Sequence, residues 1–199
     1  YLTGDDLVKH GFILEEKALR FTEKIIERFH VKTPSPQKHA GGLSGGNLQK
    51  FIMGREILQN PGVLIVNQPT WGVDVGAAAT IRNALMRLRE DGAAVLVVSE
   101  EVDELFEICD RIAVMYLGRI VELASTEQIF ENTMHPYTEA LLSAIPVVDP
   151  DNKRSRIVLE GDVPNPVHPP EGCHFHPRCK NCMDICMHKK PELKRHMIN

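Results

Sequence analysis

The sequence lacks any long apolar run, and no segment approaches the roughly 20 residues that a membrane-spanning helix needs. Any link to a membrane is therefore expected to go through a partner protein. An excess of positive charge is also missing, because 23 Lys and Arg stand against 27 Asp and Glu, a formal net charge of −4. This balance gives no reason to expect nucleic acid as a partner.

The chain also lacks the features of a natural start. It opens on Tyr1, Leu2, Thr3 and Gly4, which is neither an initiator Met nor a charged segment before an apolar signal core. We interpret it as a fragment of a longer protein. The 199 residues, 43% hydrophobic and 25% charged, are typical of a globular chain with one large domain, or one domain plus an appendage.

Hydrophobic periodicity predicts alternating helices and strands. Helices are expected at 16–29, 47–58, around 77–88, and at 102–108, 125–130 and 136–144. Strands are expected at 63–66, 93–98, 112–116 and 120–123. The strands at 63–66 and 93–98 are short apolar runs, which is typical of strands buried on both faces of a parallel sheet. The order therefore predicts an α/β fold with a parallel sheet.

The composition and hydrophobic periodicity of the sequence change near residue 124. A proline-rich stretch with little periodicity follows at 146–172, and cysteines are crowded beyond it. We place a domain boundary there, with an α/β domain over 1–124 and an irregular extension over 125–199.

A glycine-rich segment precedes the helix expected at 47–58. Its residues are Leu43, Ser44, Gly45, Gly46, Asn47 and, two positions on, Gln49. A helix N-terminus carries free N–H groups and partial positive charge, and glycines let an anion come close. The segment suits a phosphate, although a simple capping turn has the same composition.

The context of this segment resembles ATP-binding cassette (ABC) ATPases. Residues 43–49 look like the ABC signature motif, residues 63–70 like the Walker B strand, 72–74 like the D-loop, and 97–101 like the switch region, in the family's order. The resemblance implies part of a P-loop NTPase fold, ATP and Mg²⁺ as cofactors, and Asp74 as a link between paired sites. The phosphate-binding Walker A motif has no match, because Asn47 and Leu48 follow Gly46 where Lys and Ser or Thr are required.

Three positions depart from the family's catalytic pattern. The Walker B strand of the family ends in Asp and Glu, which hold magnesium and polarise water, but Asn67 and Gln68 stand here. Glu100 replaces the switch His. These departures predict that the chain does not hydrolyse ATP alone. Since ABC sites form between two subunits, the resemblance implies a signature donated to a second nucleotide-binding domain.

Four cysteines, Cys173, Cys179, Cys182 and Cys186, lie within 14 residues. In a reducing compartment such crowding favours a zinc or iron–sulfur site over disulfides, with His174 and His176 nearby, whereas unligated thiols in a tail are the alternative. Cys109 stands apart in an apolar pattern and is expected to be a small core residue.

The extension resembles the C-terminal region of oligopeptide and dipeptide transporter ATPases, through residues 135–146 and the pair Cys173 and Cys179. Some members of that group bind a four-iron, four-sulfur cluster, and Cys173, Cys179 and Cys186 match its first three cysteines. By contrast, residues 45–50 and 72–77 resemble the degenerate half of sugar- and nucleoside-type ATPases. The core and the extension thus resemble different groups of transporters. A peptide-type protein whose core has diverged and a chimaeric sequence would each explain this difference.

The resemblance implies an importer subunit on the cytoplasmic face of the plasma membrane. Its expected partners are a second nucleotide-binding domain, transmembrane permease subunits and, indirectly, a solute-binding protein. Peptides are the favoured solute and sugars or nucleosides the alternative. A metal-binding module on a catalytically dead fragment is a further alternative.

Overall fold

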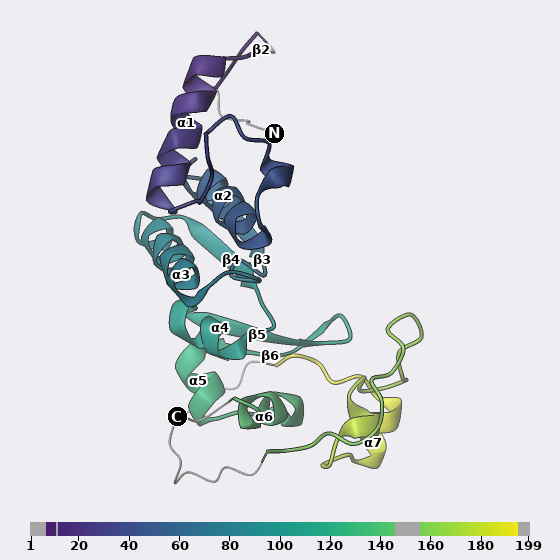
Figure 1. Ribbon diagram of the computed structural model, residues 1–199. Helices are drawn as coiled ribbons and strands as arrows, with labels where there is room; N and C mark the ends of the chain where they lie inside the picture. The colour runs from purple at the N-terminus through teal and green to yellow at the C-terminus, as the bar shows by residue number, and fades with distance from the viewer. Residues whose placement is uncertain (1–6, 11, 146–155, 195–199) are drawn as a thin grey trace. The chain divides into compact units, whose positions relative to one another are not determined.

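The computed structural model describes residues 7–10, 12–145 and 156–194. The chain forms two compact units, Tyr1–Glu100 and Glu101–Asn199, which run from purple to teal and from teal to yellow in Figure 1. The domain boundary predicted near residue 124 falls within a strand of the second unit and stays a prediction. Among the described residues, no helix combines the length and apolar character needed to cross a membrane.

The first unit contains half of the predicted helices and strands, five of ten. In chain order its elements are β1 (Val8–Lys9), β2 (Phe12–Ile13), α1 (Glu15–Arg28), the 3-10 turn η1 (Ala40–Gly42), α2 (Gly45–Ile57), β3 (Val63–Asn67), α3 (Val75–Glu90) and β4 (Ala94–Val98). The predicted helices at 16–29 and 47–58 are confirmed to within two residues. The small antiparallel β1–β2 hairpin was not predicted.

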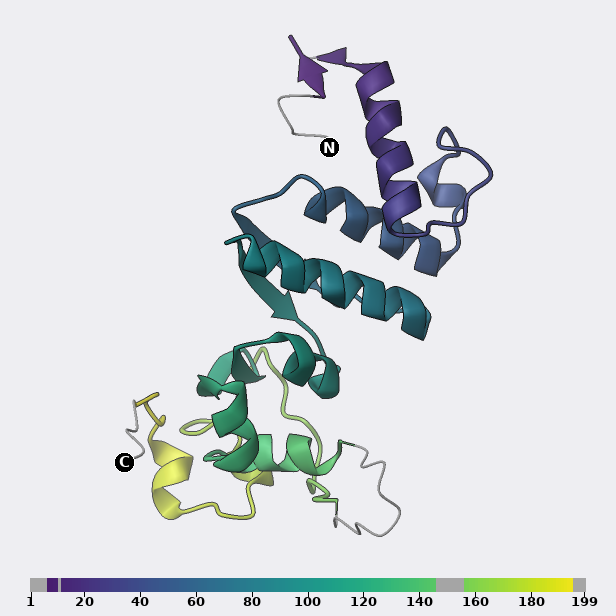
Figure 2. The same cartoon turned by 90° about the vertical axis from the view of Figure 1, so that its left-hand side faces the viewer.

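The helices α1, α2 and α3 pack in sequence, α1 on α2 and α2 on α3, as Figure 2 shows. Ile25 and Phe29 on the α1 side are almost fully buried. They approach Gly54 of α2 so closely that a Cβ there would lie 2.7 Å from the Phe29 ring and 2.8 Å from Ile25. Only glycine fits this crossing, which fixes the position of α2 and of the segment that begins it.

Strands β3 and β4 form a two-stranded parallel sheet with Val63 opposite Ala94 and Asn67 opposite Val98. The parallel pairing confirms the prediction, but burial on both faces is wrong. Leu64 and Val66 are buried, whereas Val63 and Ile65 are 67% and 68% exposed. Side chains alternate between the two faces of a strand, and in this unit only one face of the pair is covered.

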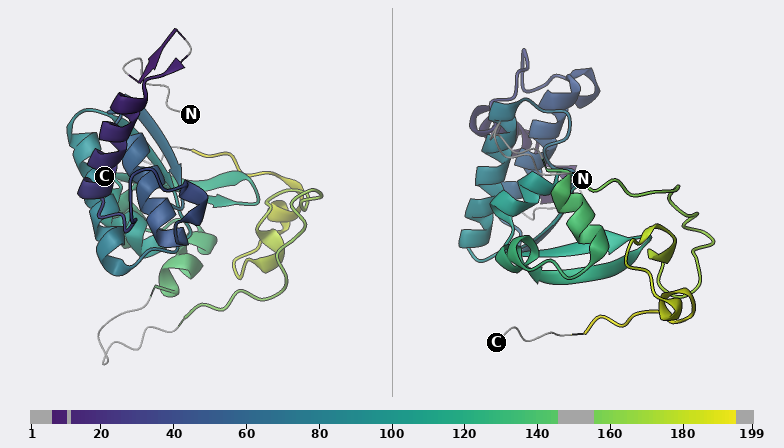
Figure 3. Two further views of the ribbon diagram at one scale, coloured as in Figure 1. Left: turned by 45° about the horizontal axis from the view of Figure 1, so that its top comes forward. Right: turned by 90° about the horizontal axis from the view of Figure 1, so that it is seen from below.

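The second unit begins with α4 (Val102–Ile108), β5 (Arg111–Tyr116) and β6 (Arg119–Ser125), and continues with α5 (Thr126–Glu131), α6 (Pro136–Ser143), η2 (His176–Arg178) and α7 (Asp184–His188). Strand β5 pairs antiparallel with β6 as a long hairpin (Figure 3). Within the described residues it pairs with no other strand. The tight turn at 117–118 makes β6 the neighbour of β5 along one edge.

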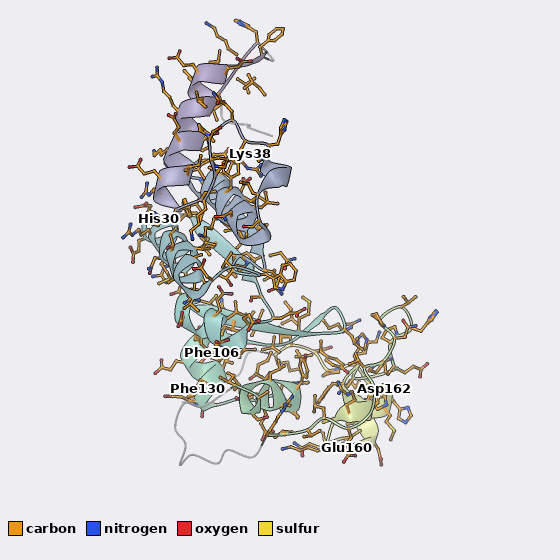
Figure 4. All side chains as sticks on the ribbon, viewed as in Figure 1. His30, Lys38, Phe106, Phe130, Glu160 and Asp162 are labelled. Atoms are coloured by element: carbon orange, nitrogen blue, oxygen red, sulfur yellow. The ribbon has the colours of Figure 1, made fainter. Side chains whose placement is uncertain are left out.

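Helices α4, α5 and α6 cover this hairpin around Ile112, Val114 and Ile129. Cys109 packs against the same cluster, as expected of a small core residue, and burial raises the pKa of its thiol. Phe106 and Phe130 meet edge to face, with ring centroids 5.8 Å apart (Figure 4).

A second aromatic cluster holds the cysteine-rich segment onto the unit. Phe175 is 1% exposed and lies 5.1 Å from the ring of Tyr116 and 5.4 Å from that of Tyr137. His135 lies 5.5 Å from the same ring. Such aromatic contacts stabilise a docked segment beyond the area they bury, so Phe175 anchors the cysteine-rich segment in the second unit's core.

Candidate signature site

The signature-like segment lies at the N-terminus of α2, as the sequence predicted. Ser44 is the N-cap residue, with extended backbone, and Gly45 begins the helix. The amide of Leu48 is the first to bond back, to the carbonyl of Ser44 at 2.8 Å. The amides of Gly45, Gly46 and Asn47 therefore precede the first bond of the helix and are available to an acceptor.

The side chain of Ser44 does not cap its own helix. Its hydroxyl oxygen accepts a hydrogen bond from Asn47 Nδ2 at 2.8 Å, and Asn47 Oδ1 accepts one from the amide of Lys32 at 2.8 Å. Because Ser44 acts here as an acceptor, its own O–H can still donate. Ser44 and Gly45 are both exposed, and a Cβ on Gly45 would meet nothing within 4 Å.

Gln49 joins α2 to the loop that follows β3. Its Nε2 donates to the carbonyl of Gln68 at 3.1 Å and to that of Pro69 at 3.0 Å. Leu43, on the other side of the glycines, is half-buried and donates its amide to the carbonyl of Ala40 at 3.0 Å. The signature-like segment is thus held at both ends.

The D-loop-like segment touches the signature-like segment directly. A Cβ on Gly46 would lie 3.1 Å from the carbonyl oxygen of Gly72 and 3.6 Å from the Cα of Val73. Two residues on, Asp74 caps α3, because its Oδ1 accepts a hydrogen bond from the amide of Ala77 at 2.9 Å.

A charged contact ties the same two segments together. Lys50 is buried, and its ammonium lies 3.8 Å from Asp74 Oδ2 and 3.4 Å from the carbonyl of His30. The hydrogen bond from Ala77, and to a smaller extent the charge of Lys50, hold the pKa of Asp74 below its ordinary value. This link was missed from the sequence, although Lys50 stands only one residue after Gln49.

The degenerate catalytic positions lie at the ends of β3 and β4. Asn67 ends β3 and is exposed. Gln68 has a φ of 50°, in the left-handed region that non-glycine residues seldom adopt, and its amide donates to the carbonyl of Val98 at 2.7 Å. Ser99 donates a weak hydrogen bond to Gln68 Oε1 at 3.5 Å. Glu100 is exposed.

The structure therefore brings the signature-like segment, the end of β3 and the D-loop-like segment into one site on the first unit. Their connections are Gln49 to Gln68, Gly46 to Gly72 and Lys50 to Asp74. The roles of Ser44, Gly45 and the other predicted site residues stay predictions.

The cysteines lie close together but do not form a metal centre. Cys173 N–H donates to the carbonyl of Cys186 at 2.8 Å, and Cys182 N–H to that of Cys179 at 3.1 Å. Burial and the neighbouring thiols raise the pKa values of Cys179 and Cys182. In the part of the chain that the structure describes, no three His, Cys, Asp or Glu side chains are arranged to hold a metal ion.

The two histidines near these cysteines take structural positions. His174 is buried beside Leu117, and burial together with the charges of Arg119 and Lys190 lowers its pKa. His176 lies with its Nδ1 2.9 Å from the carbonyl of Cys173. The expected zinc or iron–sulfur site is therefore not supported by this arrangement.

Comparison with known families gives a match in the second unit. Residues 121–186 match the family described as the C-terminal region of the oligopeptide/dipeptide transporter. This range includes most of β6, all of α5 and α6, and all four clustered cysteines. The prediction that the extension is of the peptide-transporter type is confirmed.

Curated relatives cover nearly the whole chain. The dipeptide transport ATP-binding protein DppF of Haemophilus influenzae is 37% identical over 94% of this chain and 61% of its own length. DppF of Escherichia coli is 38% identical over 90% and 53%, and the di/tripeptide transport protein of Pseudomonas aeruginosa is 38% identical over 96% and 59%. The chain thus spans between half and about three fifths of the length of these relatives.

Solved structures show the fold. The ATP-binding cassette MJ1267 of an ABC transporter gives a TM-score of 0.51 at 25% identity, over 67% of this chain and 53% of that one. The cassette MJ0796, solved as a dimer bound to ADP and phosphate, gives 0.52 at 22% identity over 59% and 51%.

The sugar- or nucleoside-type origin of the core is not supported. Peptide-transport relatives cover 90% or more of this chain at 37–38% identity, so one kind of relative accounts for the first unit as well as the extension. The motifs at 45–50 and 72–77 are too short to distinguish sugar- or nucleoside-type ATPases from peptide-type ATPases. The chain has the fold of the ATP-binding cassette and is similar, over most of its length, to the ATP-binding subunits of peptide transporters.

Proposed function

We propose that this chain acts in an ABC importer of peptides by donating its signature segment to ATP held on a second nucleotide-binding domain. The observation that carries the proposal is the start of α2, where Ser44 and Gly45 are exposed and three successive amides precede the first bond of the helix. Amides and a hydroxyl in this arrangement suit the oxygens of a γ-phosphate.

The residues around this segment fit such a role. Gly45 has open space where a side chain would stand, so an anion can approach the backbone. ATP with Mg²⁺ would supply the phosphate and its bridging charge, whereas this chain supplies donors through Ser44, Gly45 and Gly46. Gly72 lies against Gly46, and Asp74 lies near Lys50 of the same helix. A partner domain that contacts the D-loop-like segment therefore contacts the same site.

The chain's own catalytic positions do not support hydrolysis. Gln68 has no carboxylate to polarise water, and Asn67 has none to hold magnesium. Glu100 would place negative charge where the family has a His. We propose that turnover occurs on the partner's ATP alone.

The remaining partners follow from this assignment. The relatives are transport ATP-binding proteins, and we propose that this chain likewise works beneath transmembrane permease subunits, peripherally on the cytoplasmic face of the plasma membrane. A solute-binding protein would act indirectly, through the permease.

A metal-binding function for residues 173–186 remains the second candidate from the sequence. Crowding of the thiols is its only support, because the described residues contain no group of three His, Cys, Asp or Glu side chains arranged to hold a metal ion. We therefore assign no step of the proposed function to a metal at these cysteines.

The test is ATP turnover by a complete nucleotide-binding partner with and without this chain. We expect the chain to stimulate turnover and Ser44→Arg to abolish the stimulation, because a long cation would fill the space of the γ-phosphate. Asn83→Arg, which adds the same charge at an exposed position of α3, should change nothing. Equal stimulation by wild type and Ser44→Arg would refute the proposal.

A further inference from the structure

The side chain of Asn47 has both ends of its amide engaged within the chain. Its Nδ2 donates to the hydroxyl oxygen of Ser44 at 2.8 Å, and its Oδ1 accepts from the backbone amide of Lys32 at 2.8 Å. The N–H of Lys32 can only donate, so its partner must be the oxygen of the Asn47 amide. The nitrogen of that amide is therefore the end that faces Ser44.

The segment that carries the amide of Lys32 is fixed to the end of α1. Val31, the residue before it, is 5% exposed. The amide of Val31 donates to the carbonyl of Ile26 in α1 at 3.0 Å. Lys32 thus presents its N–H from a packed segment, and this N–H holds the amide of Asn47 in one orientation.

The bond between Asn47 and Ser44 does not cap the helix. Asn47 is the third residue of α2, and in a capping box the side chain at this position reaches back to the backbone N–H of the N-cap residue. Here it reaches the N-cap hydroxyl instead, and that hydroxyl makes no cap bond of its own. The bond therefore satisfies no backbone amide of α2, and its effect falls on the hydroxyl of Ser44.

This bond orders the Ser44 hydroxyl in two ways. A serine side chain that is not held divides itself among about three staggered χ1 positions, and the bond from Asn47 favours one of them. Because the Asn47 nitrogen occupies the acceptor side of the oxygen, the O–H of Ser44 points away from Asn47. A hydroxyl that accepts one hydrogen bond also donates a stronger one, since bonds in a chain polarise each other.

We propose that Asn47 is a positioning residue, which holds the Ser44 hydroxyl ready to donate to a phosphate oxygen of ATP on the partner domain. The amide of Lys32, the side chain of Asn47 and the hydroxyl of Ser44 form one directed chain of hydrogen bonds that ends on the phosphate. Donors that are fixed before the phosphate arrives need no reorganisation. This inference rests on the proposed function of the signature segment and adds a residue that acts through Ser44.

The test is a double-mutant cycle on Ser44 and Asn47. It measures how strongly the full 199-residue chain stimulates ATP turnover by a complete nucleotide-binding partner. Ser44→Ala should lower maximal stimulation about tenfold or more, the scale of a hydrogen bond to a charged group. Asn47→Ala should lower it about threefold, because the Ser44 side chain is released from one of about three positions. In the Ser44→Ala background, Asn47→Ala should have no further effect, since Asn47 acts through the hydroxyl.

Asn47→Asp separates positioning of Ser44 from support of the segment at Lys32. The carboxylate keeps an acceptor for the amide of Lys32 but has no donor for the Ser44 oxygen. Stability in chemical denaturation should therefore be retained, whereas stimulation should fall at least as far as in Asn47→Ala. The same substitution in the Ser44→Ala background measures the effect of the added charge alone.

The outcomes distinguish this inference from the proposed function. Additive losses in the cycle, or full stimulation by Asn47→Ala or Asn47→Asp, would overturn the role of Asn47 and leave that of Ser44 intact. Full stimulation by Ser44→Ala would refute the proposed function and the positioning role together. Asn83→Ala, at an exposed position of α3, is the control and should match the wild type. Circular dichroism checks the fold of each variant.

Discussion

Gly46 of the signature-like segment and Gly72 of the D-loop-like segment are in close contact, because a Cβ on Gly46 would lie 3.1 Å from the Gly72 carbonyl oxygen. The contact ties the start of α2 to the loop before α3. A change at either segment is therefore transmitted to the other through backbone atoms, which cannot rotate away as a side chain can.

Gly46→Ala should accordingly destabilise the first unit, by about 1–3 kcal/mol, the usual cost of overpacking. Gly45→Ala is the matched control, since a Cβ there meets nothing within 4 Å. Chemical denaturation of both variants measures the difference. Equal stability of Gly46→Ala and Gly45→Ala would show that the Gly72 carbonyl yields without cost.

The N-cap of α3 predicts an acid-sensitive contribution from Asp74. Its pKa is held below the ordinary value of 3.8, first by the hydrogen bond from Ala77. The folded chain therefore binds fewer protons than the unfolded chain, so the contribution is complete above about pH 3.8 and is lost as the pH falls through the lower, folded value.

Asp74→Asn keeps an oxygen acceptor for the amide of Ala77 but removes the charge. The stability difference between wild type and Asp74→Asn should thus shrink below about pH 3.8. Thermal unfolding at neutral and acid pH measures it. A difference independent of pH would rule out a charge-dependent role for Asp74.

His135 should make the second unit sensitive to mild acid. Burial lowers its pKa below 6.5, although the charge of Glu122 opposes the shift. Its Nδ1 accepts a hydrogen bond from the amide of Tyr137 at 3.1 Å and so caps α6. Protonation would remove that acceptor, and the stabilisation, complete above pH 6.5, is lost as the pH falls through the lower, folded value.

Hydrogen exchange of the α6 amides at about pH 7.5 and about pH 5.5, corrected for the intrinsic exchange rate, checks this prediction. Wild type should lose protection at the lower pH. His135→Asn, which keeps a side-chain acceptor that does not titrate, should lose less. Identical pH dependence of the two proteins would contradict the assigned role.

Phe175 should be the anchor of the cysteine-rich segment. Phe175→Ala removes a side chain that is 1% exposed and touches Tyr116 and Tyr137, and we expect a loss of about 3–5 kcal/mol in the second unit. Phe12→Ala, at a 77% exposed position, should cost no more than about 0.5 kcal/mol. Protection of the amides at 173–179 measures whether the segment detaches, and unchanged protection would refute the anchor.

Much of the first unit was predictable because local patterns determine it. Helical periodicity predicted α1 and α2, although α2 begins at Gly45, two residues before the expected start at 47. The contact between Lys50 and Asp74 was not predictable, since it joins residues that only tertiary packing brings together. The exposure of the Val63 and Ile65 side chains could not be predicted either. An apolar run in the sequence does not show which face of the strand other elements cover.

In the second unit, sequence reasoning identified the type of extension but not its packing. Crowded cysteines suggested a metal, whereas the structure gives Phe175 and His174 the buried positions and leaves Cys182 exposed. Spacing alone cannot fix where thiols point.

Hydrogen exchange at the start of α2 tests the central claim most directly. The chain is mixed with a complete nucleotide-binding partner that binds ATP but is blocked in hydrolysis, and the amides of Gly45, Gly46 and Asn47 are compared with ATP and with ADP. Phosphate donation in trans predicts strong protection of these amides with ATP and little with ADP, which lacks the γ-phosphate. Equal exchange in both nucleotides, with the partner shown to be bound, would contradict the account.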